Sequence, residues 1–127
     1  DAVINFNRYS KEDLIEVAEY YFTSFSRNFK GISKDIRLFK KILSISEKLP
    51  YPGELKNIIK TSLAFSDTQF EYDYLRRLYN TLIGNLDSTD INQLHTKGFT
   101  IREIEKLKGE SKSNIARKLN KEDVENE

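Results

Sequence analysis

The stretch that decides the fold is GFTIREIEKLKGESKSNIARKLNK, which runs from residue 98 to residue 121. It holds two short runs of apolar residues at helical spacing, and each run follows a hydroxyl residue that can cap a helix. Thr100 opens the first run and has Glu103 three residues later, the spacing of a capping box. Gly109 separates the two runs, and Ser111 opens the second. The stretch therefore predicts two short, consecutive helices.

A third short helix is expected immediately before this stretch. Ser88 or Thr89 can cap it, Ile91 and Leu94 fall on its inner side, and Gly98 can end it. Three helices of two to three turns, joined by short turns, have the size of a helix-turn-helix unit. We expect them near residues 89–97, 100–108 and 111–120.

These helices share a pattern of apolar, glycine and capping residues, which consists of Leu94, Gly98, Thr100, Glu103, Ile104, Leu107, Ser111, Ile115 and Leu119. The pattern resembles the trihelical helix-turn-helix domain of the resolvase and invertase family, and the resemblance covers about 31 of the 127 residues. It implies that residues 100–108 form a supporting helix and residues 111–121 a recognition helix that reads DNA.

Helical geometry gives the last of these helices an apolar side and a polar side. Ile115, Ala116 and Leu119 define the buried side. The opposite side carries Ser113, Asn114, Arg117, Asn120 and Lys121, and Lys112 and Lys118 lie at its flanks. Arginine pairs well with guanine, asparagine with adenine, and serine with either base, while lysine contacts phosphates. The polar side is therefore suited to read base edges in a major groove.

The local charge agrees with a DNA-binding surface. Residues 91–121 carry eight basic and three acidic side chains, whereas residues 1–90 carry thirteen of each. Residues 122–127 carry four acidic side chains and no basic ones, and we expect them to form an acidic, disordered tail. The candidate DNA-binding residues are Lys97, Thr100, Arg102, Lys108, Ser111, Lys112, Ser113, Asn114, Arg117, Lys118 and Lys121.

The N-terminal part of the chain also has helical spacing, and alternating strand-like stretches are absent from it. We expect four helices here, which span Ser10 to about Phe29, Ser33 to about Lys48, Glu54 to Phe65, and Asp67 to Gly84. Gly84 is expected to end the fourth helix in a left-handed conformation. The predicted fold is all-α, with a bundle of about four helices in residues 1–86 and a three-helix lobe in residues 87–121.

Two of these helices carry wide apolar faces. The stripe along the first helix is interpreted as core or as a dimer contact, and the fourth helix is apolar over more than half of its circumference. The apolar faces predict a homodimer through the N-terminal helices, either through Tyr21 and Phe25 or through Tyr72 and Tyr79.

The fourth helix also carries charged residues at helical spacing. We expect Asp73 to pair with Arg76 and Arg77 on this helix.

The composition argues against several functional classes. The chain has no cysteine and one histidine, so we expect no metal site. Its five glycines are scattered and form no nucleotide-binding loop, and no serine lies in a nucleophile-elbow sequence, so we expect no cofactor and no enzymatic activity. No apolar run approaches the roughly 20 residues that cross a bilayer, so we expect a cytoplasmic protein without a membrane partner.

Two functional hypotheses follow from these patterns. The first is a sequence-specific protein that binds double-stranded DNA, as a transcription regulator or an accessory factor of a mobile element such as a phage or plasmid, or of a replication or packaging system. The second is a non-enzymatic helical module, an adaptor or inhibitor, whose apolar faces bind a protein partner. A large exposed apolar patch without salt-sensitive DNA binding is expected for the second hypothesis.

Overall fold

The computed structural model describes residues 9–67, 69–109 and 112–125, and these residues form seven α-helices, one short 3₁₀ helix and no strand. The prediction of an all-α fold is therefore confirmed for the described residues. The chain divides into two compact units, Asp1–Ile83 and Gly84–Glu127. The sequence predicted this boundary three residues later, between residues 86 and 87. Leu86 belongs to the second unit because its carbonyl oxygen accepts a hydrogen bond of 2.9 Å from Lys108 Nζ.

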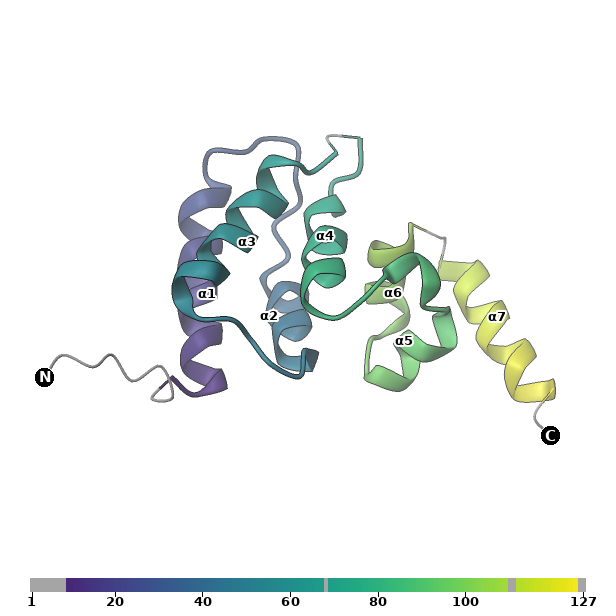
Figure 1. Cartoon of the computed structure of the whole chain (residues 1–127). Coiled ribbons are helices and arrows are strands. Elements are labelled where there is room, and N and C mark those ends of the chain that lie inside the picture. The colour runs from purple at the N-terminus through teal and green to yellow at the C-terminus, as the bar shows by residue number, and fades with distance from the viewer. Residues whose placement is uncertain (1–8, 68, 110–111, 126–127) are drawn as a thin grey trace, which may run out of the picture. The chain divides into compact units, whose positions relative to one another are not determined.

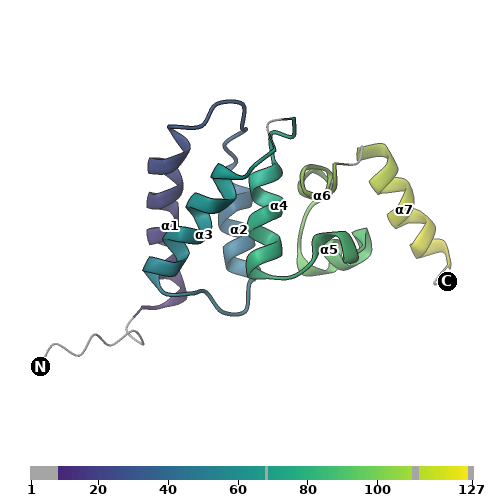
Figure 2. The ribbon, with the colours of Figure 1, turned by 45° about the horizontal axis from the view of Figure 1, so that its top comes forward.

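The first unit is a bundle of four helices (Figure 1). They are α1 (Lys11–Ser26), α2 (Ile36–Ile45), α3 (Pro52–Ala64) and α4 (Asp73–Leu82). Helix α1 packs against α2 and α3, and α4 packs against the same two helices. In both Figure 1 and Figure 2, α3 lies between α1 and α4. The contacts thus form a closed ring around one apolar core.

Local signals explain where three helices of this unit begin, through side-chain caps for α1 and α2 and a proline for α3. The Ser10 hydroxyl accepts from the Asp13 backbone N–H and the Asp13 carboxylate accepts from the Ser10 N–H, both at 3.1 Å, so the predicted start of α1 is confirmed. Asp35 caps α2 by accepting from the Leu38 N–H. Pro52 occupies the first position of α3, where its missing N–H has no helical partner to lose.

Three helices are shorter than the sequence predicted. Helix α1 ends at Ser26 rather than near Phe29, and α2 spans only Ile36–Ile45. Helix α4 begins at Asp73 rather than near Asp67, because the backbone N–H of Asp67 donates to the Asp73 carboxylate in a non-helical turn at 2.8 Å. Apolar residues keep their helical spacing beyond the observed ends of these helices. The spacing alone therefore did not predict where the helices end.

The prediction for the end of α4 is wrong in its conformation. Ile83 is the C-terminal cap and has right-handed dihedral angles, and Gly84 is not among the glycines with positive φ. Gly84 therefore correctly predicted the place where the helix ends. Neither Ile83 nor Gly84 adopts the left-handed conformation that was expected there.

The core of the first unit is centred on stacked aromatic rings and on the hydroxyl group of Tyr74. The Phe22 ring lies 4.5 Å from Phe39 and 5.5 Å from Tyr74, centroid to centroid. The Tyr74 hydroxyl donates to the Ser33 carbonyl at 2.6 Å and accepts from the Asp35 N–H at 3.0 Å. Burial raises the pKa of Tyr74 above its ordinary value, so the hydroxyl stays protonated and able to donate. This one side chain joins α4 to the segment that leads into α2.

The wide apolar faces of α1 and α4 are largely buried in the chain itself. Leu14, Ala18 and Phe22 form the buried line of α1, as the interpretation of its stripe as core requires. Tyr21 and Phe25 are half-buried and stack on each other with ring centroids 5.9 Å apart. On α4 the four buried residues are Tyr74, Leu75, Leu78 and Tyr79. Self-association through these faces stays a prediction.

Replacing Tyr74 with phenylalanine tests the role of the hydroxyl. The substitution keeps the stacked ring but leaves the Ser33 carbonyl and the Asp35 N–H without this partner. We expect the free energy of unfolding to fall by about 1–3 kcal/mol, measured by chemical denaturation. Tyr20→Phe is the matched control, because it removes the same hydroxyl oxygen from a side chain that is 68% exposed to water. Equal stability of the two variants would contradict the proposed role of the hydroxyl.

Candidate nucleic-acid interface

The second unit carries the candidate interface on three short helices and one 3₁₀ turn. Its elements are η2 (Leu86–Ser88), α5 (Ile91–Lys97), α6 (Ile101–Lys108) and α7 (Lys112–Glu125). Helices α5, α6 and α7 all contact one another, and η2 packs on α6. The three predicted helices are therefore present, although the last one is longer than expected.

The start of α5 differs from the prediction. Asp90 is its N-terminal cap, while Thr89 ends the preceding 3₁₀ turn. The Asp90 carboxylate accepts from the Gln93 N–H at 2.8 Å, and the Gln93 side chain accepts from the Asp90 N–H at 2.9 Å. This reciprocal pair satisfies two helix-end donors, whereas a cap at Ser88 or Thr89 would place no glutamine or glutamate at the third helical position.

The turn between α5 and α6 is fixed by Gly98. Its φ is 110°, in the left-handed region, and the prediction that Gly98 ends this helix is confirmed. The Gly98 N–H donates to the His95 carbonyl and the Phe99 N–H donates to the Leu94 carbonyl, both at 3.1 Å. This pattern is a Schellman motif, in which the residue after the glycine packs back on the helix. Phe99 and Leu94 are accordingly both buried.

The start and end of α6 follow the prediction. The Glu103 N–H donates to the Thr100 hydroxyl at 3.2 Å, and the Thr100 N–H donates to the Glu103 carboxylate at 2.8 Å. The predicted capping box is confirmed. Gly109 closes the helix with a φ of 71°, and its N–H donates to the Glu105 carbonyl at 2.8 Å. The end of α6 is therefore set by a local hydrogen bond.

An apolar core holds the three helices together. Its buried side chains are Leu86, Ile91, Leu94, Phe99, Ile104, Leu107 and Ile115. Ile101, Ala116 and Leu119, which the spacing also assigned to the inner side, are half-buried. Phe99 was missed because it stands between a helix-ending glycine and a helix cap. An apolar residue directly after such a glycine is itself a signal for the Schellman contact.

The outward side of α7 carries those predicted polar residues whose side chains the structure describes. Ile115 is completely buried, which fixes the rotation of the helix. Ser113, Asn114, Arg117 and Lys118 are all exposed. Within this group Arg117 Nη2 donates a hydrogen bond to Asn114 Oδ1, one helical turn earlier. The face therefore combines hydroxyl, amide, guanidinium and ammonium groups within about one turn and a half.

The remaining candidates lie on α5, α6 and the turn between them. Lys97, Thr100 and Arg102 are exposed, and the Thr100 hydroxyl also serves as the cap of α6. Lys108 is half-buried, and its ammonium group donates to the Leu86 carbonyl at 2.9 Å. Lys108 thus ties α6 to η2, a tertiary role that sequence spacing does not show.

Three candidates cannot be placed further. Ser111 lies outside the described residues, and the side chains of Lys112 and Lys121 lie outside the described part as well. The α7 backbone is helical to Glu125, so the expected disordered tail is corrected for residues 122–125. The segment after Lys121 contains no glycine or proline that would end a helix there.

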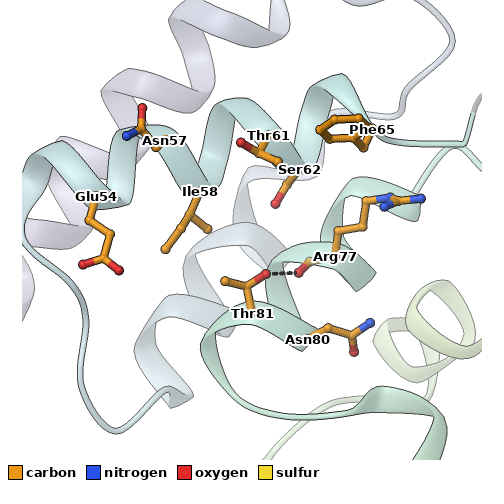
Figure 3. A pocket seen from close by; sticks show the side chains of 9 residues that line it. All are labelled: Glu54, Asn57, Ile58, Thr61, Ser62, Phe65, Arg77, Asn80 and Thr81. Atoms are coloured by element: carbon orange, nitrogen blue, oxygen red, sulfur yellow. Dashed lines mark hydrogen bonds between the residues drawn. The ribbon is translucent and has the colours of Figure 1, made fainter.

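A groove between α3 and α4 is a second surface feature, and it lies entirely within the first unit (Figure 3). Its volume is about 390 Å³, and its lining residues are Glu54, Asn57, Ile58, Thr61, Ser62, Phe65, Arg77, Asn80 and Thr81. Phe65 is 66% exposed, which is high for an aromatic side chain. The groove therefore offers apolar surface beside polar groups.

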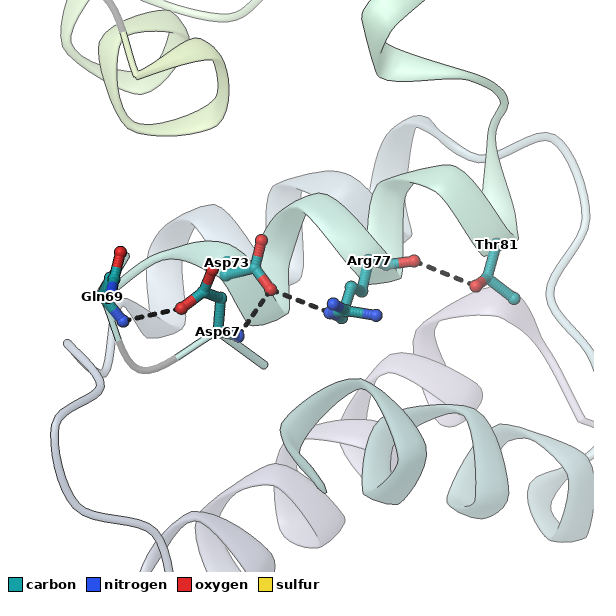
Figure 4. A network of polar contacts seen from close by, with 5 residues as sticks. All are labelled: Asp67, Gln69, Asp73, Arg77 and Thr81. Atoms are coloured by element: carbon teal, nitrogen blue, oxygen red, sulfur yellow. Dashed lines mark hydrogen bonds and ion pairs between the residues drawn. The ribbon is translucent and has the colours of Figure 1, made fainter. Parts of the chain in front are cut away.

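Arg77 is held at this groove by a polar network along α4 (Figure 4). Its Nε donates to Asp73 Oδ2 at 2.8 Å, which confirms the predicted pairing of these residues four positions apart. Asp73 also accepts from the Asp67 N–H at 2.8 Å, and the Thr81 hydroxyl donates to the Arg77 carbonyl at 2.9 Å. Arg76, which was also predicted to pair with Asp73, instead lies over the Phe70 ring, with 5.1 Å between its guanidinium carbon and the ring centroid.

Among the described residues, no three histidine, cysteine, aspartate or glutamate side chains gather where they could hold a metal ion. None of the helices in the described ranges has both the length and the apolar character that crossing a bilayer requires. Comparison with known proteins finds no matching family model, no matching curated protein and no matching solved structure.

Two glycines give opposite predictions for the same substitution. An alanine methyl at either position meets no atom within 4 Å, so the backbone decides the result. Gly98→Ala forces alanine to a φ of 110° and should destabilise the second unit by about 1–2 kcal/mol. Gly53→Ala, inside α3, should stabilise the first unit by about 0.5 kcal/mol. Thermal unfolding monitored by circular dichroism measures both, and a neutral Gly98→Ala would contradict the backbone argument.

Proposed function

We propose that this protein binds specific sequences of double-stranded DNA by inserting α7 into the major groove. The observation that carries the proposal is the exposed set of Ser113, Asn114 and Arg117 on the side of α7 opposite the fully buried Ile115. These side chains can donate to or accept from base edges, which differ among the four base pairs in the major groove. An α-helix has the right diameter to enter that groove.

Electrostatics supports the same assignment. The eight basic and three acidic side chains of residues 91–121 give this region a net charge of +5. Lys118 is exposed beside the proposed reading face, and Lys97 and Arg102 are exposed on α5 and α6. Such cations contact phosphates and release counterions, which contributes affinity that does not depend on sequence. The first ninety residues are neutral in sum and add no comparable attraction.

A single helix of this size buries little surface on DNA, so useful affinity calls for two copies on a two-fold symmetric site. We propose that the chain forms a homodimer through its N-terminal helices. The 68% exposure of Tyr20 favours α1 for this contact, because Tyr79 of the alternative contact is buried and Tyr72 is half-buried. The role proposed is that of a cytoplasmic regulator or accessory factor of a mobile element, such as a phage or plasmid, or of a replication or packaging system. The resemblance of residues 91–121 to the resolvase and invertase helix-turn-helix is consistent with it.

A second candidate function is a helical adaptor or inhibitor that binds a protein partner. The α3–α4 groove favours it, since exposed Phe65 and half-buried Ile58 offer apolar surface there. This function requires no contribution from the outward side of α7. Substitutions on that side therefore separate the two candidates.

Two substitutions on α7 should have different effects on DNA binding. Arg117→Ala should weaken binding to a preferred site by about 1–3 kcal/mol and relax the base preference there. Lys118→Ala should weaken binding to all duplexes alike and reduce the salt dependence by roughly one counterion. Both are measured by fluorescence anisotropy at several salt concentrations. If folded Arg117→Ala keeps full affinity and preference, the DNA-reading proposal fails and the adaptor function takes its place.

A further inference from the structure

Two exposed side chains of α7 form one hydrogen-bonded unit rather than two independent groups. Asn114 and Arg117 are three positions apart, a spacing that brings side chains together on a helix surface. The Arg117 guanidinium donates from Nη2 to the carboxamide oxygen Oδ1 of Asn114. The acceptor atom of Asn114 is therefore already engaged on the face proposed to meet DNA.

This engagement changes what Asn114 can recognise. Asparagine selects adenine through two simultaneous bonds, in which its oxygen accepts from N6 and its amide nitrogen donates to N7. With one lone pair of Oδ1 bound to Arg117, only the second lone pair is left for the bond that distinguishes adenine, so an adenine has to approach Asn114 beside the Arg117 guanidinium. Adenine reading by Asn114 is therefore restricted by the Arg117 contact.

The same contact favours guanine reading by Arg117. A guanidinium has five N–H donors in a planar fork, so one bond to Asn114 leaves enough donors for a parallel pair. That pair matches the O6 and N7 acceptors of guanine. A guanidinium already held in one orientation also loses less side-chain freedom on binding.

We infer that Asn114 is a positioning residue, which orients the Arg117 guanidinium toward a guanine and does not itself specify an adenine. This inference rests on the proposed function, because it assigns the base preference of the same helix face. The expected site therefore contains a guanine whose selection depends on both residues, and no adenine whose selection depends on Asn114 alone.

The test is selection of preferred sites from a library of random duplexes by the full chain and by variants at the two positions. Arg117→Ala should reduce the preference for one guanine about tenfold or more. Asn114→Ala should reduce the preference at that same base pair about two- to tenfold, through the lost orientation. The double variant should lose no more preference than Arg117→Ala alone, since the two residues act as one unit.

Asn114→Asp is the variant that separates positioning from direct reading. Its carboxylate can still accept from Arg117, so the guanine preference should be retained. The added negative charge weakens binding to every duplex by a similar factor. This effect therefore cancels when the affinities for two sites are compared as a ratio. Lys118→Ala is the matched control, because it removes an exposed cation of the same helix and should leave every base preference unchanged. Circular dichroism verifies that each variant keeps its helices.

The possible failures are distinguishable. If Asn114→Ala alters the preference at an adenine that Arg117→Ala leaves intact, the inference is overturned while the DNA-binding function stands. Loss of the guanine preference in folded Asn114→Asp has the same consequence, and so does binding of the unmodified chain without any base preference at α7. If the unmodified chain binds no duplex at either low or moderate salt, the proposed function itself falls, and the inference falls with it.

Discussion

The second unit depends on burying enough apolar surface between helices that cannot be stable alone. Helices α5 and α6 have seven and eight residues, well below the length at which isolated helices persist in water. Their stability must come from the shared core, in which Leu94, Ile104 and Ile115 are fully buried. Since Ile115 must face inward to complete this core, the rotation of α7 is fixed. The exposed polar side of α7 is thus a consequence of core packing.

Core packing fixes the rotation of α7, while the turns fix the path of the chain toward it. Two left-handed glycines, Gly98 and Gly109, end α5 and α6, and two capping boxes start these helices. These devices act within a few residues and require no distant partner. Lys108 adds the tertiary tie to the Leu86 carbonyl that holds η2 on α6. A small lobe therefore obtains a defined shape from local hydrogen bonds and only a few buried side chains.

This division between local and tertiary causes explains what the sequence could predict. The Thr100 cap, the two glycines that end α5 and α6, and the Asp73–Arg77 pair depend on residues within five positions, and all were predicted. The left-handed conformation of these two glycines was not predicted, since it was expected at Gly84 instead. The cap of α5 was misplaced by one or two residues because consecutive polar residues from Ser88 to Asp90 can all cap a helix. The tie from Lys108 to Leu86 spans 22 positions and leaves no periodic signal. The outward side of α7 was predictable because the spacing of Ile115, Ala116 and Leu119 defines the opposite, apolar side.

The uneven charge of the chain gives a physical reason for a dimer. Only residues 91–121 carry a substantial positive excess, and of their eight basic side chains Lys108 already serves the Leu86 carbonyl. At most seven basic side chains thus remain in one copy to neutralise phosphates, and affinity that depends on counterion release grows with the number of such contacts. In the proposed homodimer, two copies joined through the neutral N-terminal helices would double the phosphate contacts and the base-reading faces together. A second copy raises affinity and specificity at once, whereas additional lysines on one lobe would raise only the affinity for any duplex.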